Sequence, residues 1–159
     1  SYLDSSFLID FYTPEEFFYF SAYLYGISKD EVDNRLVSFT DFMNGEITGT
    51  NKFIRNLSAG NQQKVGIVAS LLVQPDVLIL DEPFNFLDPS SQIILSRLIV
   101  DLNTNKSSTI IVSSHNISYT TEMSSRTILM EKGKVIKDVN NLESSSKEIS
   151  NYFTEQVKQ

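Results

Sequence analysis

The sequence predicts an α/β fold in which a parallel sheet follows a helical segment. Two short apolar runs, residues 77–80 and 109–112, have the length and the composition of buried strands. The stretch between them has helical periodicity, and a strand–helix–strand unit joins parallel strands. The first run ends at Asp81 and Glu82, and ligands of α/β sheets bind at the carboxyl ends of the strands. We therefore expect a site at this edge of the sheet.

The composition is that of one soluble globular domain, and it limits the possible partners. The chain has 159 residues, 41% hydrophobic and 21% charged. A net charge of −7 argues against direct binding to nucleic acid or anionic lipid, but it leaves ATP possible, because local donors bind ATP. With no cysteine and one histidine, thiolate and multi-histidine metal sites are excluded. No apolar run reaches the roughly 20 residues of a membrane span, so we expect no direct membrane insertion.

The first part of the chain predicts two amphipathic helices. Each begins with a capping box, residues 13–16 and 28–31, in which a hydroxyl group and a glutamate satisfy the first backbone donors. Apolar residues then recur at helical spacing and predict the buried face of each helix. These residues are Phe17, Phe20 and Leu24 in the first helix, with Phe18, Ala22 and Tyr25 widening its apolar face, and Val32, Leu36, Phe39 and Met43 in the second. Residues 44–56 predict a loop.

A third helix is predicted after residues 57–61, which read Leu-Ser-Ala-Gly-Asn. Small residues and exposed N–H groups at a helix start suit a phosphate group. The apolar residues of this helix recur at i, i+3, i+4 and i+7. They are Val65, Val68, Ala69 and Leu72.

The last part of the chain continues the α/β pattern. Asp88 and Pro89 predict the start of a helix that ends near Asn103, and the second strand delivers His115 at its carboxyl end. The face of this helix is marked by Ile94, Leu98 and Leu102. A short helix, a hairpin around residues 131–133 and a capped C-terminal helix from residue 145 follow.

Together these segments resemble the nucleotide-binding domain of ABC transporters. Residues 57–61 resemble its signature sequence, residues 78–82 its Walker B strand with the catalytic glutamate, and residues 87–88 its D-loop. The resemblance implies the later part of a P-loop NTPase-like domain. Residues 1–73 would form a helical subdomain, and residues 74–159 the C-terminal half of the ATPase core.

The resemblance also implies a role for each site residue. Asp81 would hold Mg²⁺, Glu82 would polarise the attacking water, and His115 would reach the γ-phosphate of ATP. The signature residues would contact nucleotide held by a second protomer, and Asp88 would cross the interface between them. The signature residues are Leu57, Ser58, Ala59, Gly60 and Asn61. From the residues alone, two acids after a strand can simply cap a turn, and a lone histidine is more often structural.

The sequence departs from the family pattern at three places. Ala59 and Asn61 replace a glycine and a glutamine, and Asp4 is the nearest candidate for the magnesium-sensing residue that the family has before its helical subdomain. No G-x-x-x-x-G-K-[ST] loop occurs in the sequence. Because the sequence also begins at Ser1, we expect a truncated or remnant chain that does not hydrolyse ATP alone.

The resemblance implies the ATPase motor subunit of a bacterial ABC exporter. Such a subunit would pair with a second nucleotide-binding subunit and with permease subunits at the cytoplasmic face of the membrane. A ribosome-associated ABC protein is an alternative that Asn85 faintly favours, although such proteins carry two cassettes in one chain. Pro83 after the acids argues against the chromosome-associated branch. A non-catalytic binding module is the remaining alternative.

Overall fold

The structure, a computed structural model, describes residues 8–140. Asp4 and the predicted C-terminal helix lie outside the described residues. The chain divides into two compact units, the first ending at Ser113 and the second beginning at Ser114. The division into a helical subdomain, residues 1–73, and half of an ATPase core, residues 74–159, stays a prediction.

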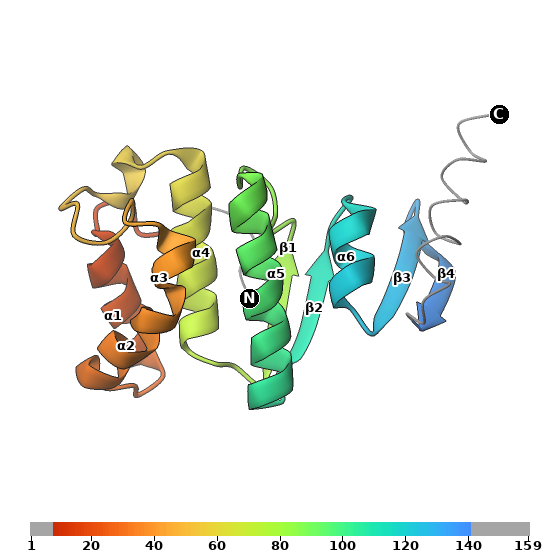
Figure 1. Ribbon diagram of the computed structural model, residues 1–159, viewed down its shortest axis with the longest axis horizontal. Coiled ribbons are helices and arrows are strands. Elements are labelled where there is room, and N and C mark those ends of the chain that lie inside the picture. Colours follow the sequence, from red (N-terminus) through yellow and green to blue (C-terminus); the bar gives the residue numbers. More distant parts are fainter. Residues whose placement is uncertain (1–7, 141–159) are drawn as a thin grey trace. The chain divides into compact units, whose positions relative to one another are not determined.

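The first unit begins with helices that surround α4 (Ala59–Leu72). The others are α1 (Pro14–Leu24), α2 (Lys29–Leu36) and α3 (Thr40–Met43), with short 3₁₀ turns η2 (Val37–Phe39) and η3 (Ile54–Asn56). α4 contacts α1, α2 and α3, and in Figure 1 it lies between these helices and α5 (Pro89–Lys106). The loop predicted over residues 44–56 is confirmed, except that its last three residues form η3.

The capping groups predicted for the first two helices are present. The backbone N–H of Glu16 donates to Thr13 Oγ1 at 3.3 Å, and the N–H of Thr13 donates to Glu16 Oε2 at 2.8 Å. At α2 the N–H of Glu31 donates to Ser28 Oγ at 3.3 Å. These contacts satisfy N–H groups that have no partner within the helix, which fixes where each helix begins.

The main stripe predicted for the buried face of α1 is wrong, although two residues of its wider apolar face, Phe18 and Ala22, are buried. Pro14, Phe18 and Ala22, spaced by four residues, face the core, whereas Phe20 and Leu24 are exposed. Residues 17–20 are all aromatic, so the apolar pattern was broader than one helix face and matched two adjacent stripes equally well. Packing against α4 selects between them.

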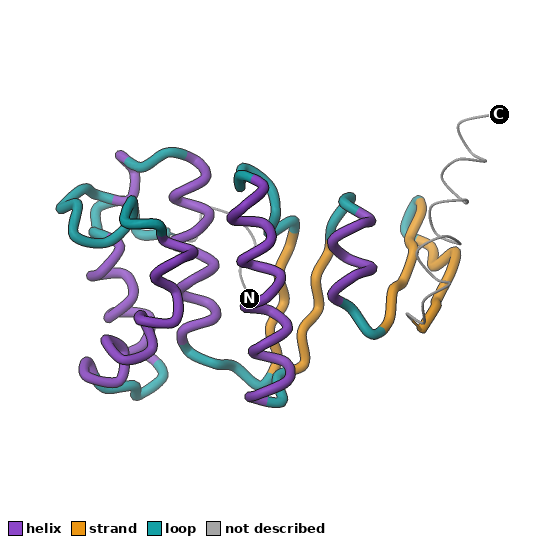
Figure 2. Tube along the Cα trace, viewed as in Figure 1, coloured by secondary structure: helices purple, strands orange, loops and turns teal. Residues whose placement is uncertain are grey.

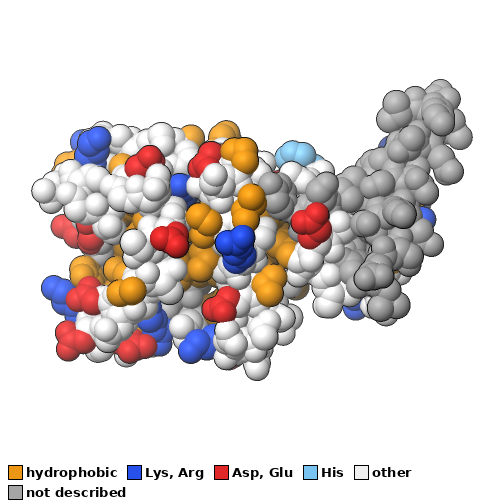
Figure 3. Space-filling model, viewed as in Figure 1, with side chains coloured by type: hydrophobic (Ala, Val, Ile, Leu, Met, Phe, Trp, Pro, Cys, Tyr) orange, Lys and Arg blue, Asp and Glu red, His pale blue; other side chains and the backbone are white. Residues whose placement is uncertain are grey.

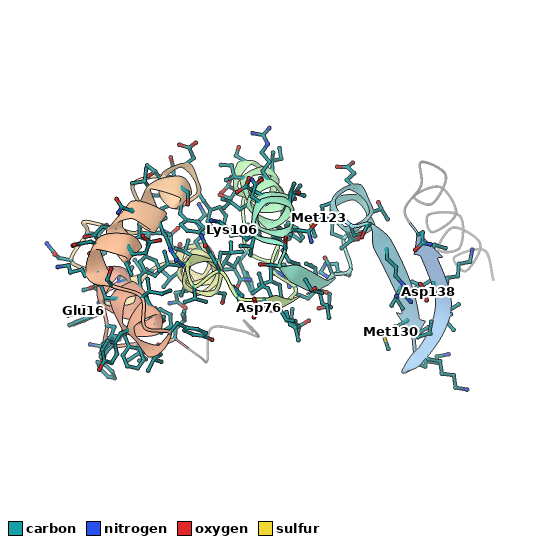
Figure 4. All side chains as sticks on the ribbon, turned by 90° about the horizontal axis from the view of Figure 1, so that it is seen from below. Glu16, Asp76, Lys106, Met123, Met130 and Asp138 are labelled. Carbon is teal, nitrogen blue, oxygen red and sulfur yellow. The ribbon has the colours of Figure 1, made fainter. Side chains whose placement is uncertain are left out.

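The helix α4 is the core of the first unit. All residues of its segment 63–69 are buried, together with Leu71 and Leu72, so the whole circumference of the helix is covered rather than one stripe. The four predicted core positions of this helix are confirmed. Figure 4 shows side chains filling the space between these helices.

The strands β1 (Val77–Asp81) and β2 (Thr109–Ser113) pair in parallel, as predicted. α5 joins them and contacts β2, and the three elements lie together in Figure 2. The register places Asp81 opposite Ser113 at the carboxyl ends of the strands. This register fixes which side chains meet at the predicted site.

Three burial predictions for this region need correction. β2, predicted as a buried strand, has no buried residue, and its side chains are alternately exposed and half-buried. β1 is buried on one face only, because Leu78 and Leu80 point inward while Val77 and Ile79 are 55% and 43% exposed. Side chains alternate across a strand, so one covered face buries only every second residue. In α5 the core residues are Leu95, Ile99 and Leu102, one position beyond the predicted face for the first two, and the helix continues to Lys106.

The second unit contains α6 (Ile117–Met123) and a hairpin of β3 (Arg126–Glu131) and β4 (Lys134–Asn140). The hairpin is antiparallel, as predicted. Arg126 donates from Nε and Nη2 to both carboxylate oxygens of Asp138, at 2.8 and 2.6 Å, and Figure 4 labels Asp138 on β4. Among the described residues, none of the helices has the length and hydropathy needed to cross a membrane.

Truncating a core side chain of α4 should destabilise the chain far more than truncating an exposed one. Ile67 is fully buried and Ile93 on α5 is 46% exposed. We expect Ile67→Ala to lower the free energy of unfolding by about 2–5 kcal/mol, because it leaves a cavity. Ile93→Ala, the matched control, should cost less than about 1 kcal/mol. Urea unfolding followed by circular dichroism measures both, and equal losses would contradict the central packing of α4.

Candidate functional site

Two acids leave the carboxyl end of β1 next to β2. The hydroxyl of Ser113 donates to Asp81 Oδ1, and the N–H of Glu82 donates to the Ser113 carbonyl at 3.0 Å. Asp81 is exposed and Glu82 is half-buried. The strand register therefore fixes the backbone at both acids through one serine.

A compact turn, residues 82–88, follows the acids and leads to α5. Glu82 and Phe86 have φ angles of 45° and 63°, in the left-handed region that costs a non-glycine residue roughly 1–3 kcal/mol. The N–H of Asn85 donates to the Glu82 carbonyl at 3.1 Å. Phe84 and Leu87 are buried and anchor the turn. The strain lies at the predicted catalytic acid and beside the predicted D-loop.

The signature residues form the start of α4. Ser58 is the N-cap, and its Oγ accepts a hydrogen bond from the N–H of Asn61 at 3.3 Å. A Cβ atom at Gly60 would lie 2.6 Å from the Phe86 carbonyl oxygen, so only glycine fits this approach. Ala59 is the first helical residue, a conformation that alanine adopts without strain.

Five of the six predicted nucleotide-binding residues line one pocket of about 420 Å³. The sixth, Leu57, precedes the N-cap and is half-buried. The pocket is lined by Glu46, Ser58, Ala59, Gly60, Asn61, Lys64, Phe86 and Asp88. The folded chain thus brings the signature segment and the predicted D-loop acid together, although they are separated by about 30 positions in the sequence.

Asp88 caps α5, as the sequence predicted. Its Oδ1 accepts from the N–H of Ser91 at 3.0 Å, and its Oδ2 accepts from the Ser91 hydroxyl at 2.5 Å. These two hydrogen bonds lower the pKa of the Asp88 carboxyl, and the ammonium group of Lys64, 3.9 Å from Oδ2, contributes in the same direction. Asp88 is therefore held as an anion at the edge of the pocket.

Three polar residues of this region were missed by the sequence interpretation. Lys64 is only 5% exposed, and its Nζ lies 5.5 Å from the centre of the Phe42 ring. Glu46 Oε2 accepts from Asn61 Nδ2 at 3.3 Å, and Gln63 is buried beside Lys64. The available signal in the sequence was that Gln63 and Lys64 directly precede an apolar helical run. A helix that is buried there must give these polar side chains specific partners.

The remaining predicted site residues lie elsewhere. His115 belongs to the second unit and is exposed, and the single histidine of the sequence is visible on the surface in Figure 3. Asp4 lies outside the described residues. Within residues 8–140 there is no group of three or more acidic or histidine side chains that could hold a metal ion. Asp81 is exposed at the end of β1, and its role as a metal ligand stays a prediction.

Comparison with known proteins agrees with the arrangement of these elements. The family model described as "AAA domain, putative AbiEii toxin, Type IV TA system" matches residues 5–120. An uncharacterised ABC transporter ATP-binding protein, YhaQ of Bacillus subtilis, is 35% identical over 116 residues, which are 72% of this chain and 38% of that protein. The chain belongs to this AAA-domain family, as the later part of an ABC transporter nucleotide-binding domain.

Further relatives extend this assignment within the ABC nucleotide-binding domains. The methionine import ATP-binding protein MetN 2 of Bacillus cereus is 33% identical over 112 residues, 70% of this chain and 33% of that protein. The dimeric structure of MJ0796, a bacterial ABC transporter cassette, has a TM-score of 0.73 at 22% identity and shares the fold over 89% of this chain and 62% of that one. The chain thus spans about a third to two fifths of the length of these two relatives.

The ion pair and hydrogen bonds of Asp88 predict how the stability of the chain depends on the ionisation of this carboxyl group. Because the folded state lowers the pKa of Asp88 below its ordinary value of 3.8, its contribution to stability is complete above pH 3.8 and is lost as the pH falls through the lowered pKa. Ser91→Ala removes the largest cause and should raise this pKa. Ser90→Ala, an exposed neighbour, is the control. Carbon-detected NMR titration of Asp88 measures the pKa, and an unchanged value in Ser91→Ala would contradict the assignment.

Proposed function

We propose that this chain is part of the ATP-hydrolysing motor subunit of an ABC transporter. One observation carries the proposal: the start of α4, with Ser58 and Gly60, lines the same pocket as Asp88. Glu82 and Asp81 follow β1, at the sheet edge where α/β proteins bind ligands. These positions support the proposal that the three segments act as signature, D-loop and Walker B groups.

The residues present fit ATP and Mg²⁺. A helix start with a serine cap and a glycine offers N–H and hydroxyl donors to a phosphate group, and the exposed carboxylate of Asp81 suits Mg²⁺. When bound, ATP supplies the phosphoryl group, and Mg²⁺ neutralises its charge. In this proposal Glu82 orients the attacking water, and His115 holds the γ-phosphate. Among the described residues no loop that would cradle the other phosphates follows a strand, so this chain alone would be inactive.

The proposed partners follow from the same pocket. Its donors would act on nucleotide bound by a second nucleotide-binding subunit, in keeping with the dimeric MJ0796 cassette. Permease subunits would hold the motor at the cytoplasmic face of the membrane. We infer export as the direction of transport. In vesicles whose nucleotide-binding subunits face the lumen, ATP-driven accumulation of substrate inside would contradict that direction and leave the motor assignment standing.

Replacing the proposed water-orienting acid should separate binding from turnover. In the whole protein, Glu82→Gln should preserve ATP binding and lower kcat by about two orders of magnitude or more, because the amide cannot accept a proton. Glu31→Gln, at an exposed position on α2, is the control. Turnover assays and ATP titration measure the two quantities. Parallel losses of binding and turnover would mark Glu82 as structural and contradict its role as the water-orienting acid.

A bulky cation at the signature should block association of two subunits. In the Glu82→Gln background, Ser58→Arg should leave ATP binding to each subunit nearly unchanged and abolish ATP-dependent dimerisation, since it replaces a small donor in the pocket. Ser28→Arg changes another exposed N-cap serine, on α2, and is the matched control. Sedimentation velocity with ATP gives the dimer fraction. An undiminished dimer in Ser58→Arg would instead favour a binding module that does not pair through α4.

A further inference from the structure

We propose that Gln63 is a positioning residue that fixes the turn carrying Glu82 and thereby couples the signature helix to the acid of the same subunit. The inference rests on the proposed function for its catalytic consequence. Its structural part rests on the contacts of α4 alone. Gln63 was not singled out in the sequence.

Gln63 reaches the backbone immediately after β1. Its side chain is buried, with 7% of the residue exposed, and its Nε2 donates to the Pro83 carbonyl at 3.3 Å. The same Nε2 lies 3.5 Å from the Glu82 carbonyl, which shares the amide. A buried amide that lost these acceptors would leave polar groups unpaired on both sides, at a cost of about 1–3 kcal/mol. Gln63 therefore contacts the two peptide groups that flank Pro83, the one from Glu82 to Pro83 and the one from Pro83 to Phe84.

The turn needs such support because its own backbone bonds are few. Apart from the hydrogen bond from Asn85, the N–H of Leu87 donates to the Phe84 carbonyl at a long 3.4 Å. A second glutamine acts at the far end of the turn, where Gln92 Nε2 donates to the carbonyls of Phe84 and Leu87 at 3.1 and 3.2 Å. One side-chain amide from α4 and one from α5 thus brace the strained segment, and Gln63 braces the half that carries the acid.

The contacts of Gln63 belong to one face of α4. Gly60, Gln63 and Lys64 are spaced i, i+3 and i+4, which places them side by side on a helix. Gly60 lies against the Phe86 carbonyl, and Lys64 lies 3.9 Å from Asp88. This face of α4 therefore contacts the turn at its first residue, Glu82, and at its last, Asp88.

This packing connects the pocket to Glu82 through α4. The start of α4 lines the pocket, and three residues later the same helix holds the carbonyl of Glu82. A ligand or partner that shifts the start of α4 would also shift the peptide that sets the direction of the Glu82 side chain. We therefore assign Gln63 the role of keeping the acid oriented when the signature engages.

Amide hydrogen exchange tests the brace in this chain. Gln63→Met keeps the length of the side chain and removes its donors, whereas Gln62→Met is the matched control, because Gln62 Nε2 donates to the Leu57 carbonyl instead, at 3.1 Å. We expect exchange at Asn85 and Leu87 to quicken at least about tenfold in Gln63→Met only, because the turn opens more often. Unchanged exchange, or the same increase in Gln62→Met, would overturn the proposal.

ATPase kinetics of the whole protein test the consequence for the acid. Gln63→Met should lower kcat about tenfold or more while the KM for ATP and the ATP-dependent dimer fraction stay unchanged. In Gln63→Glu, kcat should recover partly as the pH falls, because a protonated carboxyl can again donate to a carbonyl. A fall in kcat matched by an equal fall in the dimer fraction would mark a loss of folded protein and overturn the positioning role. A wild-type protein without ATPase activity would refute the proposed function, while the exchange data would still report whether Gln63 braces the turn.

Discussion

The burial of α4 on every side over residues 63–69 is the constraint on which the first unit depends. A helix covered on every side has one position and one rotation, since each of its faces meets a different neighbour. The same helix begins at the pocket with Ser58 and touches the turn after β1 through Gln63. Because the core and the site share this element, packing alone determines where the donors at the helix start lie. The site needs no separate scaffold.

Much of this arrangement was predictable because the signals are local. The capping residues Thr13, Ser28 and Asp88 mark helix starts because their side chains accept hydrogen bonds from N–H groups three positions along the chain. The parallel pairing of the two strands follows from the single helix between them. The apolar positions after Gly60 also proved correct, since a helix with a regular apolar repeat has only one way to enter a core.

The failures have a common physical cause, which is that partners distant in sequence decide them. The rotation of α1 is selected by α4, so Phe18 rather than Phe20 is buried. The partners of Gln63 and Lys64 lie some twenty or more residues further along the chain, and no spacing rule connects them. The left-handed conformation of Phe86 was equally hidden, because nothing in a phenylalanine signals it. Family resemblance located the motifs, whereas the contacts between motifs required the fold.

The uncovered side of β1 has a consequence for the behaviour of the chain in solution. Val77 and Ile79, with Ile111 on β2, present β-branched side chains to water, and in the described part of the chain each of the two strands has only the other as a neighbour. Strands with open edges and an apolar side recruit further strands from other molecules. The excess of acidic groups, a net charge of −7, opposes such contacts by repulsion at low ionic strength. Added salt should therefore lower the colloidal stability of this chain, because it weakens the repulsion that keeps the strands of different molecules apart.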